Sequence, residues 1–305
     1  MTRYIIKRLL LMIPVLIGVS LIVFCISGVN TDPIIFSIGG EEMSNEEYLE
    51  LKHELGFDEP VLVRYVKYMS GMLRGDLGKS HISGNDVFQT YKDKIPVTVN
   101  LAFYSVLVSI ILSIPLGIIS ALKSGSLTDN VGMFFALLGL SIPNFWLGLM
   151  LIIGFSLKLG WFPTMATQEG GMFLPSLSLS LYPMAYITRL ERSAMLDVLG
   201  QDYIRTAKAK GLKNGKIIFK HALKNALSPV ITYAGPMMAY ILTGSMVVEN
   251  IYSVPGLGRL FVNSMLRTDY MMIMGVTIFL AAMIILMNFL SDILYKIVDP
   301  RIDLS

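Results

Sequence analysis

Long runs without charged residues dominate the pattern of this chain. Six stretches contain no Asp, Glu, Lys or Arg: residues 9–31, 95–122, 130–157, 170–188, 225–248 and 270–291. A helix that crosses a bilayer core requires about 20 apolar residues. Lipid offers no hydrogen-bond partners, so the backbone N–H and C=O groups must bond to one another within the helix. The pattern therefore predicts an all-α integral membrane protein with six transmembrane helices. The run 170–188 is the shortest, and Pro175 and Pro183 predict that its helix is kinked or begins late.

Composition agrees with a membrane protein, since 54% of the residues are hydrophobic and 15% are charged. Soluble domains carry about a quarter charged residues. The net charge of +3 is too small and too localised to favour a nucleic-acid partner. Cys25 is the only cysteine, which excludes an internal disulfide. The run 9–31 follows Arg3, Lys7 and Arg8 as in a signal peptide, but its length and the lack of a small-x-small cleavage site predict a retained helix.

The distribution of positive charge predicts the orientation. The basic N-terminus is expected in the cytoplasm, and six crossings bring residues 123–129, 189–224 and the C-terminal tail to the same side. The region 189–224 has nine Lys/Arg against three acidic residues, whereas the outer loop 32–94 has seven against twelve. The expected parts are 1–31 with the N-terminal cytoplasmic end and the first transmembrane helix, 32–94 as an extracellular helical loop, and 95–305 as a five-helix core. This core carries a cytoplasmic segment, 189–224, which we call the coupling segment.

The outer loop is expected to contain two short helices. Ser44 and Glu47 form a capping-box pattern before a helix from Asn45 to Leu55 that Gly56 ends. A second helix is expected to open at Pro60 and to stop near Gly71. The 63 residues of the loop exceed what a connection requires. This favours a platform for an extracellular partner over a structural cap on the helix ends.

No source of energy is evident within the chain. Gly78-Lys79-Ser80 ends like a phosphate-binding loop, but Leu73 stands where that motif needs its first glycine. The apolar runs also lack the ionisable residues that proton- or voltage-coupled proteins keep at membrane depth. We therefore expect no ATP site, cofactor or metal on this chain, and no coupling to an ion gradient, although backbone sodium sites stay open. Energy for uphill transport would then come from a partner.

The basic part of the coupling segment has a helical pattern of its own. Helices are expected from Asp197 to Lys210 and from Lys213 to Leu227, with a left-handed break at Gly211. The apolar residues expected to pack the pair together are Ile204, Ala207, Leu212, Ile217, Ile218 and Leu223. Such a pair favours docking of a soluble motor. A surface bound to anionic lipid headgroups is the alternative.

At these residues the chain resembles the permease subunits of ATP-binding-cassette (ABC) importers, in particular the first permease of the dipeptide/oligopeptide family. The resemblance rests on DYIRTAKAKGL at 202–212 with HALKNAL at 221–227, and on four further stretches at 4–9, 73–80, 249–260 and 299–301. The family carries an EAA-type motif in a cytoplasmic loop. In this chain the triplet Arg205-Thr206-Ala207 stands in place of the motif's Glu-Ala start, and the later Ile-x-Leu-Pro of the motif is also absent. Met271 stands where the family usually has Pro.

The resemblance implies a multi-pass protein of the cell membrane with the type I ABC importer permease architecture. It implies a second homologous permease in a heterodimer, two cytoplasmic ABC ATPases that use ATP and Mg, an extracellular substrate-binding protein, and surrounding membrane lipid. The chain itself would be a transport subunit and no enzyme. A coupling helix around Ala207 to Lys216, bent at Gly211, would receive the ATPases.

Two groups of residues are candidates for function. The ATPase-coupling residues implied by the resemblance are Arg205, Thr206, Ala207, Lys208, Lys210, Gly211, Leu212, Lys213, His221 and Leu223. Each lysine among them is also compatible with solvent or lipid contact, and for His221 a helix-packing role is favoured over pH sensing. Glu249, Pro255, Gly256 and Gly258 are expected at an external re-entrant turn near the pore, with a plain tight turn as the alternative.

The expected function is import of dipeptides and oligopeptides driven by ATP. The same architecture would also serve a nickel chelate, glutathione or another small solute, because the binding protein makes most of the selection. From a different class, a channel or an ion-gradient-driven carrier would transport without an ATPase. The uncharged apolar runs and the basic segment count against this second class.

Overall fold

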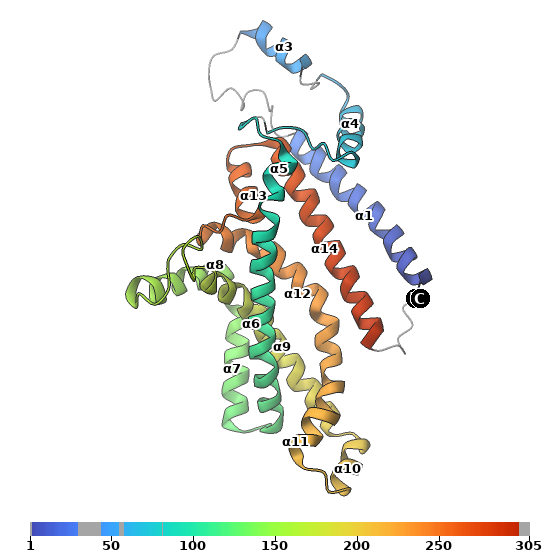
Figure 1. Ribbon diagram of the computed structural model, residues 1–305, viewed down its shortest axis with the longest axis vertical. Coiled ribbons are helices and arrows are strands. Elements are labelled where there is room, and N and C mark those ends of the chain that lie inside the picture. Colours follow the sequence, from blue (N-terminus) through green and yellow to red (C-terminus); the bar gives the residue numbers. More distant parts are fainter. Residues whose placement is uncertain (1, 30–43, 55–57, 81, 299–305) are drawn as a thin grey trace. The chain divides into compact units, whose positions relative to one another are not determined.

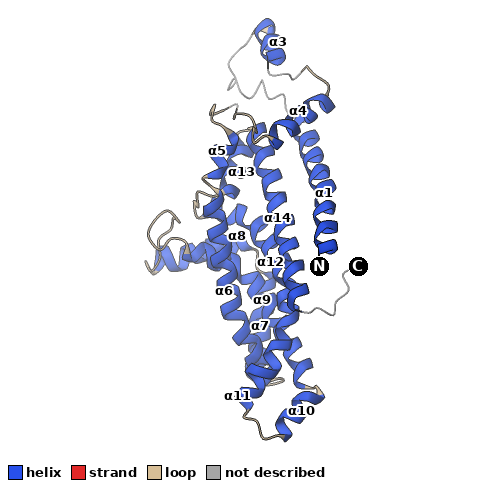
Figure 2. Cartoon of the chain, turned by 45° about the vertical axis from the view of Figure 1, so that its right-hand side comes forward, coloured by secondary structure: helices blue, strands red, loops and turns tan. Residues whose placement is uncertain are grey.

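A computed structural model describes residues 2–29, 44–54, 58–80 and 82–298. These residues form helices and turns, apart from an isolated antiparallel bridge between Lys79 and Asp86 (Figure 2). The described residues fall into two compact units. Unit 1 comprises the described residues within 1–98 and 255–285, and unit 2 comprises those within 99–254 and 286–305.

Within the described residues, four helical stretches are long and apolar enough to cross a membrane: Ile5–Ile26, Val87–Leu122, Asn214–Ile251 and Tyr270–Ile293. The helices of 127–158 pass the same test only as a bent pair, which gives up to five spans. The helix over 173–199 does not meet the criterion. An all-helical protein with several apolar spans is therefore confirmed, whereas the expected number of six is not.

The run 130–157 is not one helix, contrary to the expectation from its composition. It divides into α7 (Leu127–Ser141) and α8 (Asn144–Leu151), which continues as the wider-wound η1 (Ile152–Lys158), and the two parts meet at 106°. Pro143 lies at the break and precedes the first residue of α8. A proline cannot donate the backbone hydrogen bond that a continuous helix requires, and it disfavours helical geometry at the residue before it, here Ile142.

Unit 1 contains α1 (Thr2–Val29), α3 (Asn45–Glu54), α4 (Val61–Leu73), α5 (Val87–Lys92) and α13 (Leu257–Leu266), with parts of α6 (Ile95–Leu122) and α14 (Tyr270–Val298). Phe24 of α1 and Tyr65 of α4 pack with Tyr270 and Met274 of α14 in one buried cluster. The Tyr65 hydroxyl lies 2.8 Å from the Ser20 hydroxyl, which fixes α4 against α1.

The outer-loop helices follow the sequence pattern, with one shift. Ser44 and Glu47 form the expected capping box, in which Glu47 N donates to Ser44 Oγ and Ser44 N donates to the Glu47 carboxylate. These bonds from Ser44 lower the pKa of Glu47. Gly56 lies outside the described residues. The second helix continues past Gly71 to Leu73. Gly71 lies inside this helix at a close approach, since a Cβ there would lie 2.9 Å from the carbonyl oxygen of Asp76.

Unit 2 is built around α9 (Phe173–Leu199), which packs against α7, α8 and α12 (Leu223–Ile251) (Figure 1). The helix begins late, as expected, at Phe173, so that Pro175 occupies its first turn, where no backbone donor is needed. The Tyr252 hydroxyl donates to the carbonyl of Gly148 across 3.0 Å, which ties the end of α12 to α8.

Candidate coupling surface

The coupling segment folds into a short helix and a turn at one end of unit 2. After α9 ends at Leu199, α10 (Asp202–Ala209) runs to a turn at 210–213. The chain then re-enters a continuous helical stretch through α11 (Asn214–Lys216) and η2 (Ile217–Ala222) into α12. Figures 1 and 2 show α10 and α11 beside each other at this end. We refer to residues 202–220 as the basic tip.

Gly211 produces the turn through its left-handed backbone, with φ of +74°. The amide of Gly211 donates to the carbonyl of Lys208, and that of Leu212 donates to the carbonyl of Ala207. This pair of bonds is the Schellman arrangement, in which a left-handed residue satisfies the last carbonyls of a helix. Nothing lies within 4 Å of a Cβ built on Gly211. The glycine is therefore required for its backbone conformation and not for lack of space.

A buried apolar cluster fixes the tip to the helices behind it. Ile204 and Ala207 of α10 pack with Ile217 of η2 and with Met195 of α9. Further members are Ile118 and Ala121 of α6, Ala222 of η2 and Ala226 of α12, with Leu212, Ile218 and Leu223 partly buried against them. The packing expected from the apolar spacing is confirmed. In addition, Asn225 Nδ2 donates to the Tyr203 hydroxyl across 2.8 Å, which ties α12 to α10.

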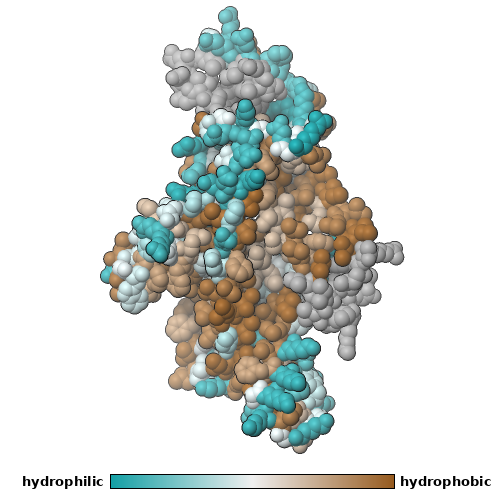
Figure 3. Space-filling model, in the orientation of Figure 1, coloured by the Kyte–Doolittle hydropathy of each residue, from teal (hydrophilic) through white to brown (hydrophobic). Residues whose placement is uncertain are grey.

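The exposed surface of the tip is largely hydrophilic (Figure 3), and its charged residues are mostly cations. Its exposed cations are Arg205, Lys208, Lys210, Lys213, Lys216 and Lys220. Arg205 makes a solvent-exposed ion pair with Asp202 at 3.4 Å, and no ion pair is seen for the lysines within the described part of the chain. Sequence reasoning overlooked Phe219 of η2, whose side chain is 68% exposed. Aromatic residues are enriched in protein–protein interfaces, so this exposed ring is a further candidate for contact with a partner.

The remaining candidate residues of the tip have structural positions. Thr206 is exposed, and its hydroxyl donates to the backbone carbonyl of Asp202 at 3.0 Å. His221 is half-buried in η2, and its carbonyl accepts from Asn225 Nδ2. The preference for a packing role of this histidine over pH sensing stays a prediction.

Two expected helix boundaries are wrong. No single helix covers Asp197 to Lys210, because α9 ends at Leu199 and α10 starts after Gln201 with an extended backbone at that residue. The segment from Ala207 to Lys216 is likewise a helix end, a turn and the first residues of α11. The short helix before the turn at Gly211 is therefore α10.

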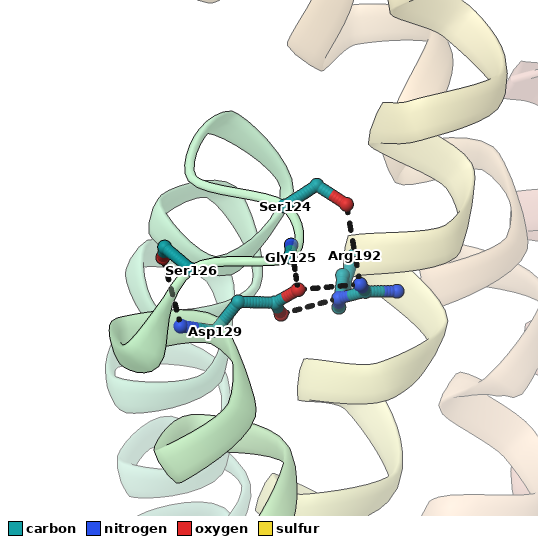
Figure 4. Close-up of polar contacts among 5 residues, drawn as sticks. All are labelled: Ser124, Gly125, Ser126, Asp129 and Arg192. Carbon is teal, nitrogen blue, oxygen red and sulfur yellow. Dashed lines mark hydrogen bonds and ion pairs between the residues drawn. The ribbon is translucent and has the colours of Figure 1, made fainter.

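An ion pair not foreseen from the sequence holds the neighbouring turn between α6 and α7 (Figure 4). Asp129 is 1% exposed, and Arg192 of α9 binds both of its carboxylate oxygens at 2.6 Å. Gly125 N donates to the same carboxylate, and Arg192 also reaches the Ser124 hydroxyl at 3.4 Å. The spacing of Ser126 and Asp129, a capping-type pattern, was the available signal.

The residues of the expected external turn fall into different units. Glu249 is buried in α12 of unit 2, and its carbonyl accepts from Val254 N at 2.8 Å. In unit 1, Pro255 precedes Gly256, which caps α13 with an extended backbone, and Gly258 is buried within that helix. Leu257 N donates to the Thr98 hydroxyl at 2.8 Å. A helix therefore follows Gly256 directly, and the proximity of these residues to a pore stays a prediction.

Comparison with known proteins identifies the family of this fold. Residues 113–304 match the binding-protein-dependent transport system inner membrane component family, and residues 1–102 match the N-terminal region of such membrane components. The chain belongs to this family of membrane transport components.

Similar proteins span the whole chain. The oligopeptide transport system permease protein AppB of Bacillus subtilis is 41% identical over 99% of this chain and 100% of its own length. The dipeptide transport system permease proteins DppB of Bacillus subtilis and of Escherichia coli K12 are 40% and 36% identical, each over at least 99% of both chains. A chain from an inward-facing structure of the MetNI methionine ABC transporter has the same fold, with a TM-score of 0.58 at 18% identity, and the match covers 69% of this chain and 96% of that one.

Proposed function

We propose that this chain is a membrane-spanning permease subunit of an ATP-driven ABC importer for dipeptides and oligopeptides. Full-length similarity to permeases named for oligopeptide and dipeptide transport supports this substrate class. In this proposal a second homologous permease completes the translocation path, two cytoplasmic ATPases hydrolyse ATP with Mg as its cofactor, and an extracellular binding protein delivers the peptide. The chain itself catalyses no reaction.

The proposed topology has six crossings and cytoplasmic termini. In this topology α9 is the sixth crossing, although it does not meet the criterion of length and apolarity. Its N-terminal part coincides with the uncharged run 170–188. The bent pair of α7 and α8 counts as one crossing. The basic tip then lies in the cytoplasm, in agreement with the excess of positive charge there.

The observation that carries the proposal is the construction of the basic tip. One face of α10 shares a buried cluster with the ends of α6, α9 and α12, and the other face presents cations to solvent. A partner that binds the cations can therefore displace three long helices together, because a packed cluster transmits a displacement as a unit. This is the mechanical requirement for converting closure of an ATPase pair into a change of access across the membrane.

Reconstitution tests the proposal. The chain would be purified in mild detergent from its native membrane, and the proteins that accompany it would be identified. Proteoliposomes with that complex are expected to accumulate labelled trialanine when ATP and the loaded binding protein are present, and not with a non-hydrolysable ATP analogue.

Other results would favour the alternatives. Displacement of trialanine by a nickel chelate or by glutathione at lower concentration would assign one of those solutes. Transport by the isolated chain, without any ATPase, would favour a channel or a gradient-driven carrier and contradict the proposal.

A further inference from the structure

One face of α9 carries a polar stripe that no feature described so far uses. Tyr182, Tyr186, Arg189 and Ser193 recur at intervals of four, three and four residues, the spacing that brings side chains onto one side of a helix. Arg189 and Ser193 are exposed, whereas Ile187, Glu191 and Met195 on the other side are buried. The stripe begins within the uncharged run 170–188 and passes beyond its end.

The stripe differs from the surfaces of unit 2 that suit lipid. Exposed positions of the neighbouring helices are large and apolar, for example Phe103 and Ile111 of α6 and Phe135 of α7. Polar and charged side chains of membrane helices usually face water-filled space or protein. The open side of α9 is therefore suited to an aqueous path and not to the acyl chains of lipid.

Aromatic contacts continue the stripe onto α12. Tyr182 stacks on Tyr240 with ring centroids 4.4 Å apart, and Tyr186 stacks on Tyr233 at 4.2 Å. Asn144 of α8 donates to the Tyr240 hydroxyl at 3.0 Å. Three helices thus fix the orientation of these rings, in contrast to tyrosines that stand singly at a membrane interface. Rings held in this way form a preorganised wall for a ligand.

Two hollows lie along this wall and share Arg189 and Ser193. One has a volume of about 460 Å³ and is lined by Leu140, Tyr182, Tyr186, Arg189, Leu190 and Ser193. The other, of about 440 Å³, continues towards Met133, Leu137 and Arg192. Sites for small ligands generally occupy 300 to 1,000 Å³. Both hollows fall within this range.

The two arginines of the wall differ in charge balance. Arg192 is neutralised by the buried Asp129, which binds it through two hydrogen bonds. Arg189, one helical turn away, has no ion pair or hydrogen bond with any residue that the structure describes. A guanidinium without a partner in the described residues is available to bind an anion, and its planar donors match a carboxylate.

We propose that Arg189, with the tyrosine wall of α9 and α12, forms a binding subsite for the C-terminal carboxylate of a short peptide on its way through the permease. The guanidinium binds the carboxylate, and the stacked tyrosines contact the peptide backbone and side chains. This inference rests on the proposed function, since it names the part of the chain that the imported peptide meets.

Peptide binding to the complex without its binding protein tests the subsite. The full complex in lipid nanodiscs is equilibrated with labelled trialanine or with trialanine amide, which lacks the negative charge. We expect the wild type to bind the acid about tenfold more tightly than the amide, a difference appropriate to one charge-assisted hydrogen-bonded pair. Arg189→Gln should remove this preference, and Arg189→Lys should keep part of it.

Lys158→Gln is the matched control, because it removes an exposed cation of unit 2 that lies outside both hollows. It should leave the acid-to-amide preference unchanged. An equal preference in wild type and Arg189→Gln would overturn the subsite. Loss of the second permease from the Arg189→Gln complex would also overturn it, by assigning the guanidinium to a subunit contact.

Uptake in proteoliposomes separates this inference from the proposed function. Wild-type uptake of trialanine with an unchanged acid-to-amide preference in Arg189→Gln would contradict the subsite alone. Absence of any peptide uptake or binding by the wild type would contradict the proposed function and the subsite with it.

Discussion

At the scale of single residues, the geometry of the basic tip depends on Gly211. Its φ of +74° lets α10 end with the last carbonyls satisfied and sends the chain back towards α12. Residues other than glycine, asparagine and aspartate rarely adopt this left-handed backbone conformation, which costs an L-residue about 1–2 kcal/mol. The surrounding space is open, so the cost arises in the backbone and not from a clash.

Gly211→Val is therefore expected to displace α10 and to reduce both ATPase association and ATP-dependent uptake several-fold. Co-purification of the ATPases and transport assays measure the two effects. Gly211→Asn should retain most activity, because asparagine tolerates the left-handed conformation. Gly215→Ala, at a nearby glycine of α11 without positive φ, should be neutral. Full uptake and ATPase association in Gly211→Val would contradict the lever mechanism.

At the scale of elements, the ion pair between Asp129 and Arg192 fixes the α6–α7 turn to α9. Removal of one partner from a buried pair leaves an uncompensated charge. Because a quarter of the Arg192 side chain reaches solvent, we expect a cost of about 2 kcal/mol for Asp129→Asn, below the range for a fully buried pair. The apparent melting temperature of the purified complex should fall by a few degrees.

A double-mutant cycle separates the ion pair from other effects of the substitution. Arg192→Gln added to Asp129→Asn should cost much less than the sum of the two single changes, because each single change already breaks the same pair. Additive costs would show that the two side chains act independently, in contradiction to the geometry.

The sequence predicts elements well where one local rule decides them. The capping box at Ser44 and the left-handed turn at Gly211 follow from residue chemistry over three to five positions. The break at Pro143 was missed because apolar content alone cannot distinguish a straight helix from two helices at 106°. The stripe at Tyr182, Tyr186 and Arg189 was missed because it crosses the end of an uncharged run, and its stacking partners come from α12.

At the scale of the whole molecule, the two sides of the tip have different roles. Apolar packing attaches one side to the long helices, and the other side presents positive charge to solvent. The buried cluster holds α10 to three long helices, and long-range partners such as Ile118 and Met195 cannot be inferred from the local pattern. The exposed lysines, in contrast, could be predicted, because they depend only on helical spacing and on charge. The tip is therefore a surface with a rigid base, suited to a partner whose own surface is acidic.

Reversal of charge at Lys208, Lys210 and Lys213 tests this division of roles. The triple change to Glu should leave the fold and its thermal stability unaltered, because all three side chains are exposed and make no ion pair within the described residues. Association with the ATPases should weaken at least tenfold, and added salt should then strengthen it instead of weakening it, because the proposed favourable charge pairs become repulsive and salt screens that repulsion. Triple change to Gln should give an intermediate loss. Unaltered association in the Glu variant, with loss only of binding to anionic lipid vesicles, would assign the tip to the membrane surface and exclude it as the site where ATPase closure acts on the permease.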